Sequence, residues 1–228
     1  MATIAKFYLH DAASPNTGTM PSTSPCAVQG LTATGDVTGA TTARAADDTI
    51  GTLQKSSTAT ALANTTTQNW GHRRFVSSPL AARTIAAADG NWTWSYARSE
   101  SALNHNATFF LGVWVWRPGT GAQVGTNANS ARVQGTEPGT SEAVEAFTNS
   151  IGWGTTLAIS DGDILVFDIC VSFTQSKSSL FTDSFFYDGT TEASASSCAS
   201  FVAPPVAYTL FGAAAAGIPD VGMGLRVT

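Results

Sequence analysis

Carboxylates are the residues of this 228-residue chain whose type first suggests chemistry. Hydrolysis of a glycosidic bond needs two carboxyl groups that flank the bond. Asp168 stands out because it lies in a strongly apolar stretch, and its simplest interpretation is the solvent-facing position of a half-buried strand. Other candidates in the strand-rich part of the chain are Glu137, Glu142, Glu145, Asp183, Asp188 and Glu192.

Histidines and cysteines show no spacing typical of a catalytic or metal site. The six residues are His10, His72, His105, Cys26, Cys170 and Cys198. The chain also has no nucleophile elbow, phosphate-binding loop or dinucleotide fingerprint. We therefore expect no catalytic residue, no cofactor and no metal ligand. Two points stay open. One is a Cys26–Cys198 disulfide. The other is a calcium ion at the Asp161-Gly162-Asp163 or Asp188-Gly189 turn, which needs further loop oxygens to converge there.

Composition argues against several classes of partner. Charged residues make up 12% of the chain, the formal net charge is −5, and Arg73-Arg74 is the only basic pair. A duplex-binding protein needs a basic stripe, which this sequence lacks. No segment approaches the ~18 apolar residues of a membrane span, and the first residues lack the pattern of a signal peptide. We expect neither nucleic acid nor a membrane as partner, and synthesis in a cytoplasm.

Aromatic residues form two sets, each on one face of an alternating segment. Trp92, Trp94 and Tyr96 make up the first set, and Trp114 and Trp116 the second. Such a face stacks on sugar rings, anchors a subunit interface or packs in a core. Burying a tryptophan removes roughly 150–250 Å² from water, which stabilises by about 4–6 kcal/mol at ~25 cal/mol per Å². Core packing is the most economical interpretation, with an interface and a glycan platform as alternatives.

Residues 107–117 form a predicted strand that is apolar on both faces. Such a strand must be covered on both sides. We expect an opposing sheet on one side and a long loop or a neighbouring subunit on the other. The two sets are Phe109, Leu111, Val113 and Val115 on one face, and Phe110, Trp114 and Trp116 on the other.

Several alternating segments separated by turn residues, without alternating helices, predict an all-β fold, an antiparallel β-sandwich or jelly roll. Residues 142–147 fit either a helical turn or a strand. The Thr-, Ser- and Ala-rich stretch 11–69 and the tail 203–228 predict extended arms that lie on their own domain or on a neighbour. The predicted organisation has three parts: an N-terminal strand and arm (1–69), a β-sandwich core (70–202) and a C-terminal arm (203–228).

Three motifs, together with the N-terminal arm, resemble structural proteins of tailed bacteriophage particles. They span residues 114–121, 161–167 and 186–192. The resemblance implies a non-enzymatic β-sandwich in a virion, most simply a capsid decoration or cement protein or another surface protein of the head or tail. Its implied partners are further copies of the chain, with a trimer as one arrangement, and other virion proteins such as the major capsid protein.

Two other functions remain as alternatives to a virion structural protein. The first is a carbohydrate-binding module or host-glycan adhesin that uses one of the aromatic faces. The second is a sandwich-fold polysaccharide hydrolase that uses two of the carboxylates. Loss of glycan binding in Trp94→Ala favours the former, and loss of turnover in Asp168→Asn favours the latter.

Overall fold

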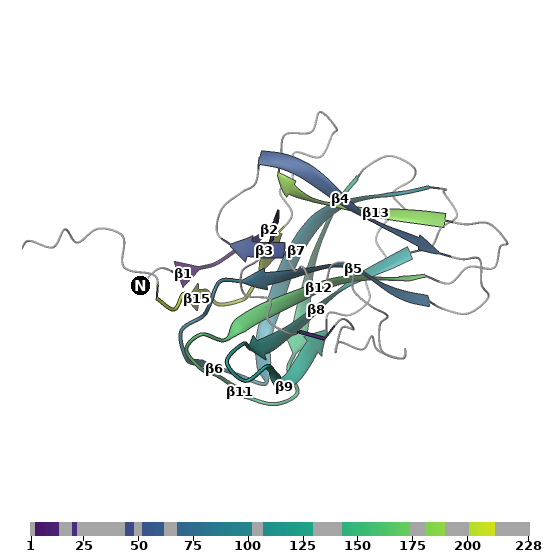
Figure 1. Cartoon of the computed structure of the whole chain (residues 1–228). Coiled ribbons are helices and arrows are strands. Elements are labelled where there is room, and N and C mark those ends of the chain that lie inside the picture. Colours follow the sequence, from purple (N-terminus) through teal and green to yellow (C-terminus); the bar gives the residue numbers. More distant parts are fainter. Residues whose placement is uncertain are drawn as a thin grey trace, which may run out of the picture.

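A computed structural model describes residues 3–13, 20–21, 44–47, 52–61, 68–101, 107–129, 143–173, 181–189 and 201–212. Within these residues every regular element is a strand (Figure 1). The predicted all-β class is therefore confirmed. Residues 143–147, where the sequence left a helical turn or a strand open, belong to a strand.

The described strands differ widely in length, from two residues to thirteen. They are β1 (Thr3–Ile4), β2 (Phe7–Ala13), β3 (Arg44–Asp47), β4 (Thr52–Ala61), β5 (Gln68–Ser77), β6 (Arg83–Ile85), β7 (Ala88–Glu100), β8 (Ala107–Arg117), β9 (Ala122–Asn129), β10 (Ala143–Gly152), β11 (Leu157–Ile159), β12 (Ile164–Phe173), β13 (Phe181–Gly189), β14 (Phe201–Ala203) and β15 (Tyr208–Thr209).

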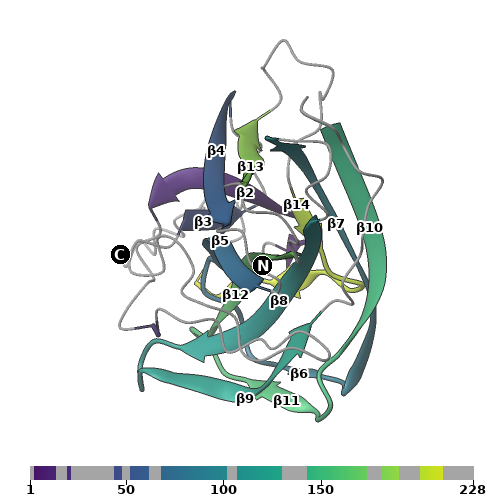
Figure 2. The same ribbon diagram turned by 90° about the vertical axis from the view of Figure 1, so that its right-hand side faces the viewer.

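Hydrogen bonding joins the long strands into two layers. The first runs β10-β7-β13-β4, and the second runs β9-β8-β12-β5. The short strands β14, β2 and β3 link β7 of the first layer to β5 of the second. Figure 2 shows β10 and β7 on one side of the molecule, and β8, β12 and β5 on the other. Of the described ladders, β3–β5 is parallel and the others are antiparallel. The antiparallel sandwich prediction is thus confirmed in outline.

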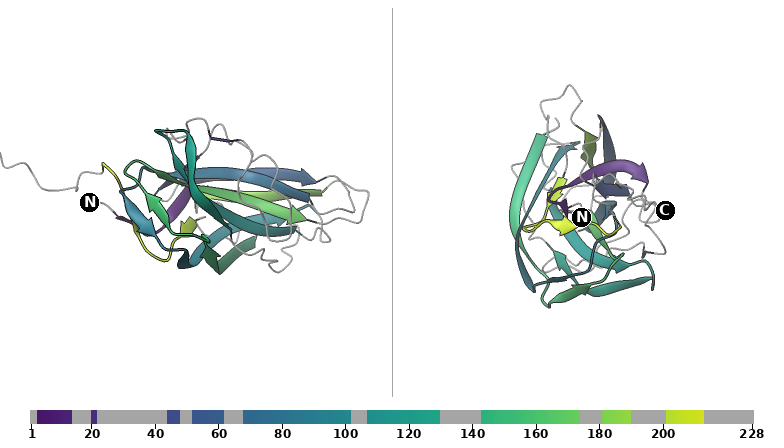
Figure 3. Two further views of the ribbon diagram at one scale, coloured as in Figure 1. Left: turned by 90° about the horizontal axis from the view of Figure 1, so that it is seen from below. Right: turned by 90° about the vertical axis from the view of Figure 1, so that its left-hand side faces the viewer.

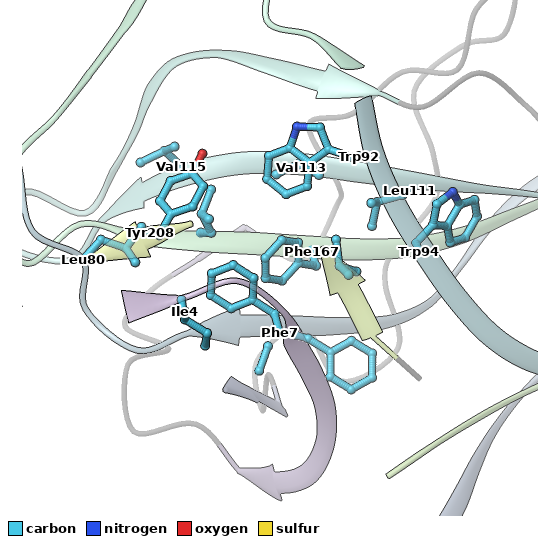
Figure 4. Packing of buried hydrophobic residues seen from close by; sticks show 14 of the residues in the cluster. Ile4, Phe7, Leu80, Trp92, Trp94, Leu111, Val113, Val115, Phe167 and Tyr208 are labelled. Carbon is cyan, nitrogen blue, oxygen red and sulfur yellow. The ribbon is translucent and has the colours of Figure 1, made fainter. Parts of the chain in front are cut away.

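The main core lies between these layers (Figure 4). Trp92 and Trp94 of β7 approach the apolar side chains of β8 and β12. The ring of Phe167 on β12 lies 6.4 Å from Trp92 and 5.1 Å from Phe7, measured between centroids. Trp94 stacks on Tyr96 at 5.0 Å. Alternation along β7 therefore turns its aromatic residues inward, as the core interpretation predicts.

Strands from both ends of the described chain meet at one end of the sandwich. β1 pairs with β15 near the N-terminal end (Figures 1 and 3). Leu80 forms a bridge with Leu210. Further along the predicted N-terminal arm, β3 pairs with β2 and β4 pairs with β13, so both belong to the main sheet. The described strands of residues 1–69 thus share a sheet with the predicted core, while the three-part division stays a prediction. Most of both predicted arms lies outside the described residues.

We expect Phe167→Ala to lower the free energy of unfolding by about 3–5 kcal/mol, because it leaves a cavity beneath two aromatic rings. Urea unfolding followed by tryptophan fluorescence measures the change. Val206→Ala is the control, because Val206 is 55% exposed and its truncation changes stability by only about 0.5 kcal/mol. Equal losses in the two variants would contradict the core as described.

Candidate functional site

The five aromatic residues predicted as an interface or glycan platform all lie in the interior. Their exposed fractions are 0% for Trp92, 1% for Trp94, 1% for Tyr96, 0% for Trp114 and 4% for Trp116. None of them therefore presents a face to a sugar ring or to a second subunit. The structure corrects the alternative of an exposed aromatic face, because each face is covered by other parts of the same chain.

A second apolar cluster covers the outer face of the β5-β12-β8 layer. Trp114 and Trp116 project to this face, opposite to Leu111, Val113 and Val115. Met20, which is 6% exposed and lies in the N-terminal part of the chain, belongs to the same buried cluster. The cluster comprises Met20, Val76, Trp114, Trp116, Ile164 and Val166. For residues 110–116, whose side chains the structure describes, the prediction that both faces are covered is confirmed, and a segment of the same chain contributes to the second cover.

A buried ion pair lies within this outer face. Register places Arg74 of β5 directly opposite Asp168 of β12. Arg74 Nε donates to Asp168 Oδ1 at 2.7 Å, and Arg74 Nη2 donates to Oδ2 at 3.0 Å. Both side chains are fully buried. A buried charge is tolerated only with such a partner, so the two residues depend on each other.

Two further groups complete the network around this pair. Trp114 Nε1 donates to Asp168 Oδ2 at 3.0 Å, and the Arg74 guanidinium lies 5.0 Å from the centre of the Trp114 ring. Arg74 Nη1 donates to the backbone carbonyl of Pro21. Gly112 of β8 lies opposite Asp168. Because glycine has no side chain, the Trp114 ring can occupy the space beside the Asp168 carboxylate. The network thus ties β5, β8, β12 and the 20–21 segment together.

Asp168 was predicted to face solvent, and this prediction is wrong. The position alternates to the outer face as expected, but Arg74 and Trp114 occupy both of its carboxylate oxygens beneath the 20–21 segment. Because this carboxylate is also fully buried, it is not accessible to a substrate. The sequence contained one usable signal, since an arginine and an aspartate that both lie in apolar strands each require a buried partner.

A shallow cavity of about 390 Å³ lies at the β8–β9 turn, beside the 160–163 turn. Arg117 Nε and Nη2 donate to the two oxygens of Asp163 at 2.8 and 2.7 Å, and the Ser160 amide donates to Oδ2 at 2.8 Å. The hydrogen bond and charge of Asp163 raise the pKa of Arg117 above its ordinary value. Asp161 Oδ1 accepts from the Ala82 amide at 2.7 Å.

These contacts assign the Asp161-Gly162-Asp163 carboxylates to turn structure. Gly162 has φ of 89°, a conformation that favours glycine. Each aspartate accepts from protein donors, and among the described residues no group of three or more His, Cys, Asp or Glu is placed to hold a metal ion. The described oxygens at the Asp161-Gly162-Asp163 turn therefore do not support a calcium site.

The remaining candidate residues are placed only in part. Cys170 is buried beside Phe110, and the question whether Cys26 and Cys198 pair stays open because both lie outside the described residues. Glu145, Asp183 and Asp188 lie on described strands. Outside the described residues lie Cys26, His105, Glu137, Glu142, Glu192 and Cys198.

Comparison with known proteins gives distant similarities only. No protein-family model matches the chain, and no curated protein matches it. A CocE/NonD family hydrolase from Staphylococcus aureus aligns with a TM-score of 0.41 and 7% identity, over 72% of this chain and 34% of that one. A structure of the infectious bursal disease virus Gx strain aligns with a TM-score of 0.24 and 11% identity, over 73% and 38% of the two chains. The VP2 subviral particle of infectious bursal disease virus aligns with a TM-score of 0.18 and 11% identity, over 70% of this chain and 41% of that one.

The chain therefore spans well under half the length of these three solved chains. None of the described segments is a helix long and apolar enough to cross a membrane.

We expect Asp168→Asn to lower the free energy of unfolding by about 3–5 kcal/mol, because it leaves the buried Arg74 charge without its counter-charge. Urea unfolding of Arg74→Met, Asp168→Leu and their combination measures the coupling as a double-mutant cycle. The double variant Arg74→Met with Asp168→Leu is expected to recover much of the loss. Additive losses from the two positions would contradict a coupled pair.

Proposed function

We propose that this chain is a non-enzymatic structural protein of a virus particle that works through subunit–subunit contacts. Within that class, a capsid decoration or cement protein, or another surface protein of the head or tail, is the favoured role. The resemblance of residues 114–121, 161–167 and 186–192 to phage structural proteins supports the class. The partners in this proposal are further copies of the chain and other virion proteins, such as the major capsid protein.

The observation that carries the proposal is that the outermost strands of the two layers have an edge with no described partner strand. β4 and β10 lie at the two ends of the first layer, and β9 lies at one end of the second. On its outer side none of these strands pairs with another described strand. Exposed strand edges are a liability for a soluble monomer, whereas they are the natural contact surface for a protein that assembles by adding strands.

Surface composition supports the same proposal. Only 12% of the residues are charged, although soluble monomers generally carry more charge on their surface. Val206 and Phe211 are 55% and 49% exposed, and both lie beside β15, where the two ends of the described chain meet. Several modest contacts of this kind hold a lattice together when many copies engage at once.

The structure offers less support for the other two functions. The aromatic residues on which the glycan-binding interpretation rests are buried. The carboxylate on which the hydrolase interpretation rests is bonded to Arg74 and Trp114. We therefore assign these residues a role in the stability of the fold. We propose neither a glycan platform nor a hydrolytic site at these residues.

We expect the purified chain to form a defined oligomer at micromolar to millimolar concentration, because pairing with further copies would bury its exposed apolar residues and the strand edges that no described strand pairs with. Size-exclusion chromatography with light scattering over a wide concentration range measures the mass against the 23.5 kDa of one chain. A single-chain mass at every concentration would contradict self-association.

A further inference from the structure

We propose that the shallow cavity at the β8–β9 turn is a binding site for a neutral sugar residue. The cavity lies between the turn that follows Arg117 and the turn at residues 160–163. It is separate from the buried aromatic residues of the two layers. The site adds a ligand to the proposed assembly role and does not depend on that role.

The cavity is open to solvent. Pro118, Gly119, Ser160 and Asp161 line it, and all four are exposed. Figure 2 shows the turn that joins β8 to β9 at the periphery of the molecule. The cavity volume of about 390 Å³ falls within the range of small-molecule sites, roughly 300–1,000 Å³. A ligand of the size of a sugar ring can therefore reach the cavity and occupy it.

Three polar groups of the lining keep hydrogen-bonding capacity. Arg117 bonds to Asp163 and Ser160 through Nε and Nη2, and its Nη1 makes no hydrogen bond with a described residue. Asp161 accepts from the Ala82 amide through Oδ1, and its Oδ2 makes no hydrogen bond within the described part of the chain. The Ser160 hydroxyl oxygen accepts from Arg117 at 3.0 Å, which leaves its hydrogen available to donate. The lining thus offers two donors and one acceptor.

The charges of the lining favour a neutral ligand. A cation that approaches Asp161 enters the cavity that the Arg117 guanidinium also lines, and an anion that approaches Arg117 meets the Asp161 carboxylate. A hydroxyl group carries no charge and both donates and accepts hydrogen bonds. Neighbouring hydroxyls of one sugar ring can therefore donate to Asp161 and accept from Arg117 at the same time. The exposed Pro118 ring offers an apolar surface to the C–H groups of the same sugar.

The binding groups are held in place by the fold. Asp163, whose side chain is 1% exposed, accepts from Arg117 Nε at 2.8 Å and from Nη2 at 2.7 Å. The Ala82 amide holds the Asp161 carboxylate at 2.7 Å. Groups that are already ordered lose little conformational freedom when a ligand binds. The contacts that stabilise the two turns therefore also prepare the cavity for its ligand.

Saturation-transfer difference NMR on the full chain tests the site, with glucose, galactose, mannose and N-acetylglucosamine as probes. We expect at least one of these sugars to bind and Gly119→Leu to abolish its signal, because the new side chain fills the cavity. A Cβ at Gly119 meets no atom within 4 Å, and its φ is outside the left-handed region. Gly152→Leu is the matched control, because Gly152 is equally open and lies outside the lining.

A second variant tests the polar contacts. Ser160→Ala removes the hydroxyl donor, while the Ser160 amide can still donate to Asp163 Oδ2. We expect this variant to weaken binding of the sugar by about two- to ten-fold, the effect of one hydrogen bond between neutral groups. Titration of the sugar measures the affinity, and circular dichroism checks that each variant keeps the fold.

The outcomes separate this site from the proposed function. Absence of a signal from all four sugars would overturn the inference. A signal that Gly119→Leu retains would overturn it as well, because the sugar would then bind elsewhere. Loss of the signal in Gly152→Leu as well as in Gly119→Leu would also count against this cavity. The mass of the oligomer is a separate measurement, so failure of the sugar site leaves the assembly role unchanged.

Discussion

The rest of the structure depends on one constraint, which is that the described side chains of the β5-β12-β8 layer, at residues 74–76, 110–116 and 164–170, are buried on both faces. Its inner face packs against β7, and its outer face carries Trp114, Trp116 and the charged pair Arg74–Asp168. A charged pair at that depth is stable only when both ions keep their partners and water stays out. The 20–21 segment contributes in two ways, since Met20 belongs to the buried cluster of the outer face and the Pro21 carbonyl accepts from Arg74.

This constraint bears directly on function. Because the layer is covered by its own chain, the aromatic residues considered as a ligand platform stabilise the fold. The same cover takes Asp168 out of reach of any substrate. What remains for recognition, within the described part of the chain, is the rim of the sandwich, where strands end unpaired and apolar side chains are exposed. An assembly protein that binds through its edges fits this distribution better than a protein with a central pocket.

Sequence reasoning predicted the layers better than the site. Alternation along residues 107–117 indicated the two buried faces, because strand periodicity is a local property. It did not find that Asp168 pairs with Arg74, which lies 94 residues away, since that contact depends on which strands become neighbours. The contribution of Met20 and Pro21 was equally out of reach, because their stretch of sequence has no regular period. Asp168 was therefore assigned to the correct face and to the wrong environment.

Amide hydrogen exchange of the full chain at low and high protein concentration tests the central claim most directly. If the chain itself covers both faces of this layer, residues 110–116 and 164–170 exchange only on global unfolding, at the same rate at both concentrations. Protection of these residues that appears only at high concentration would contradict this account, because the cover of the outer face would then come from a neighbouring molecule.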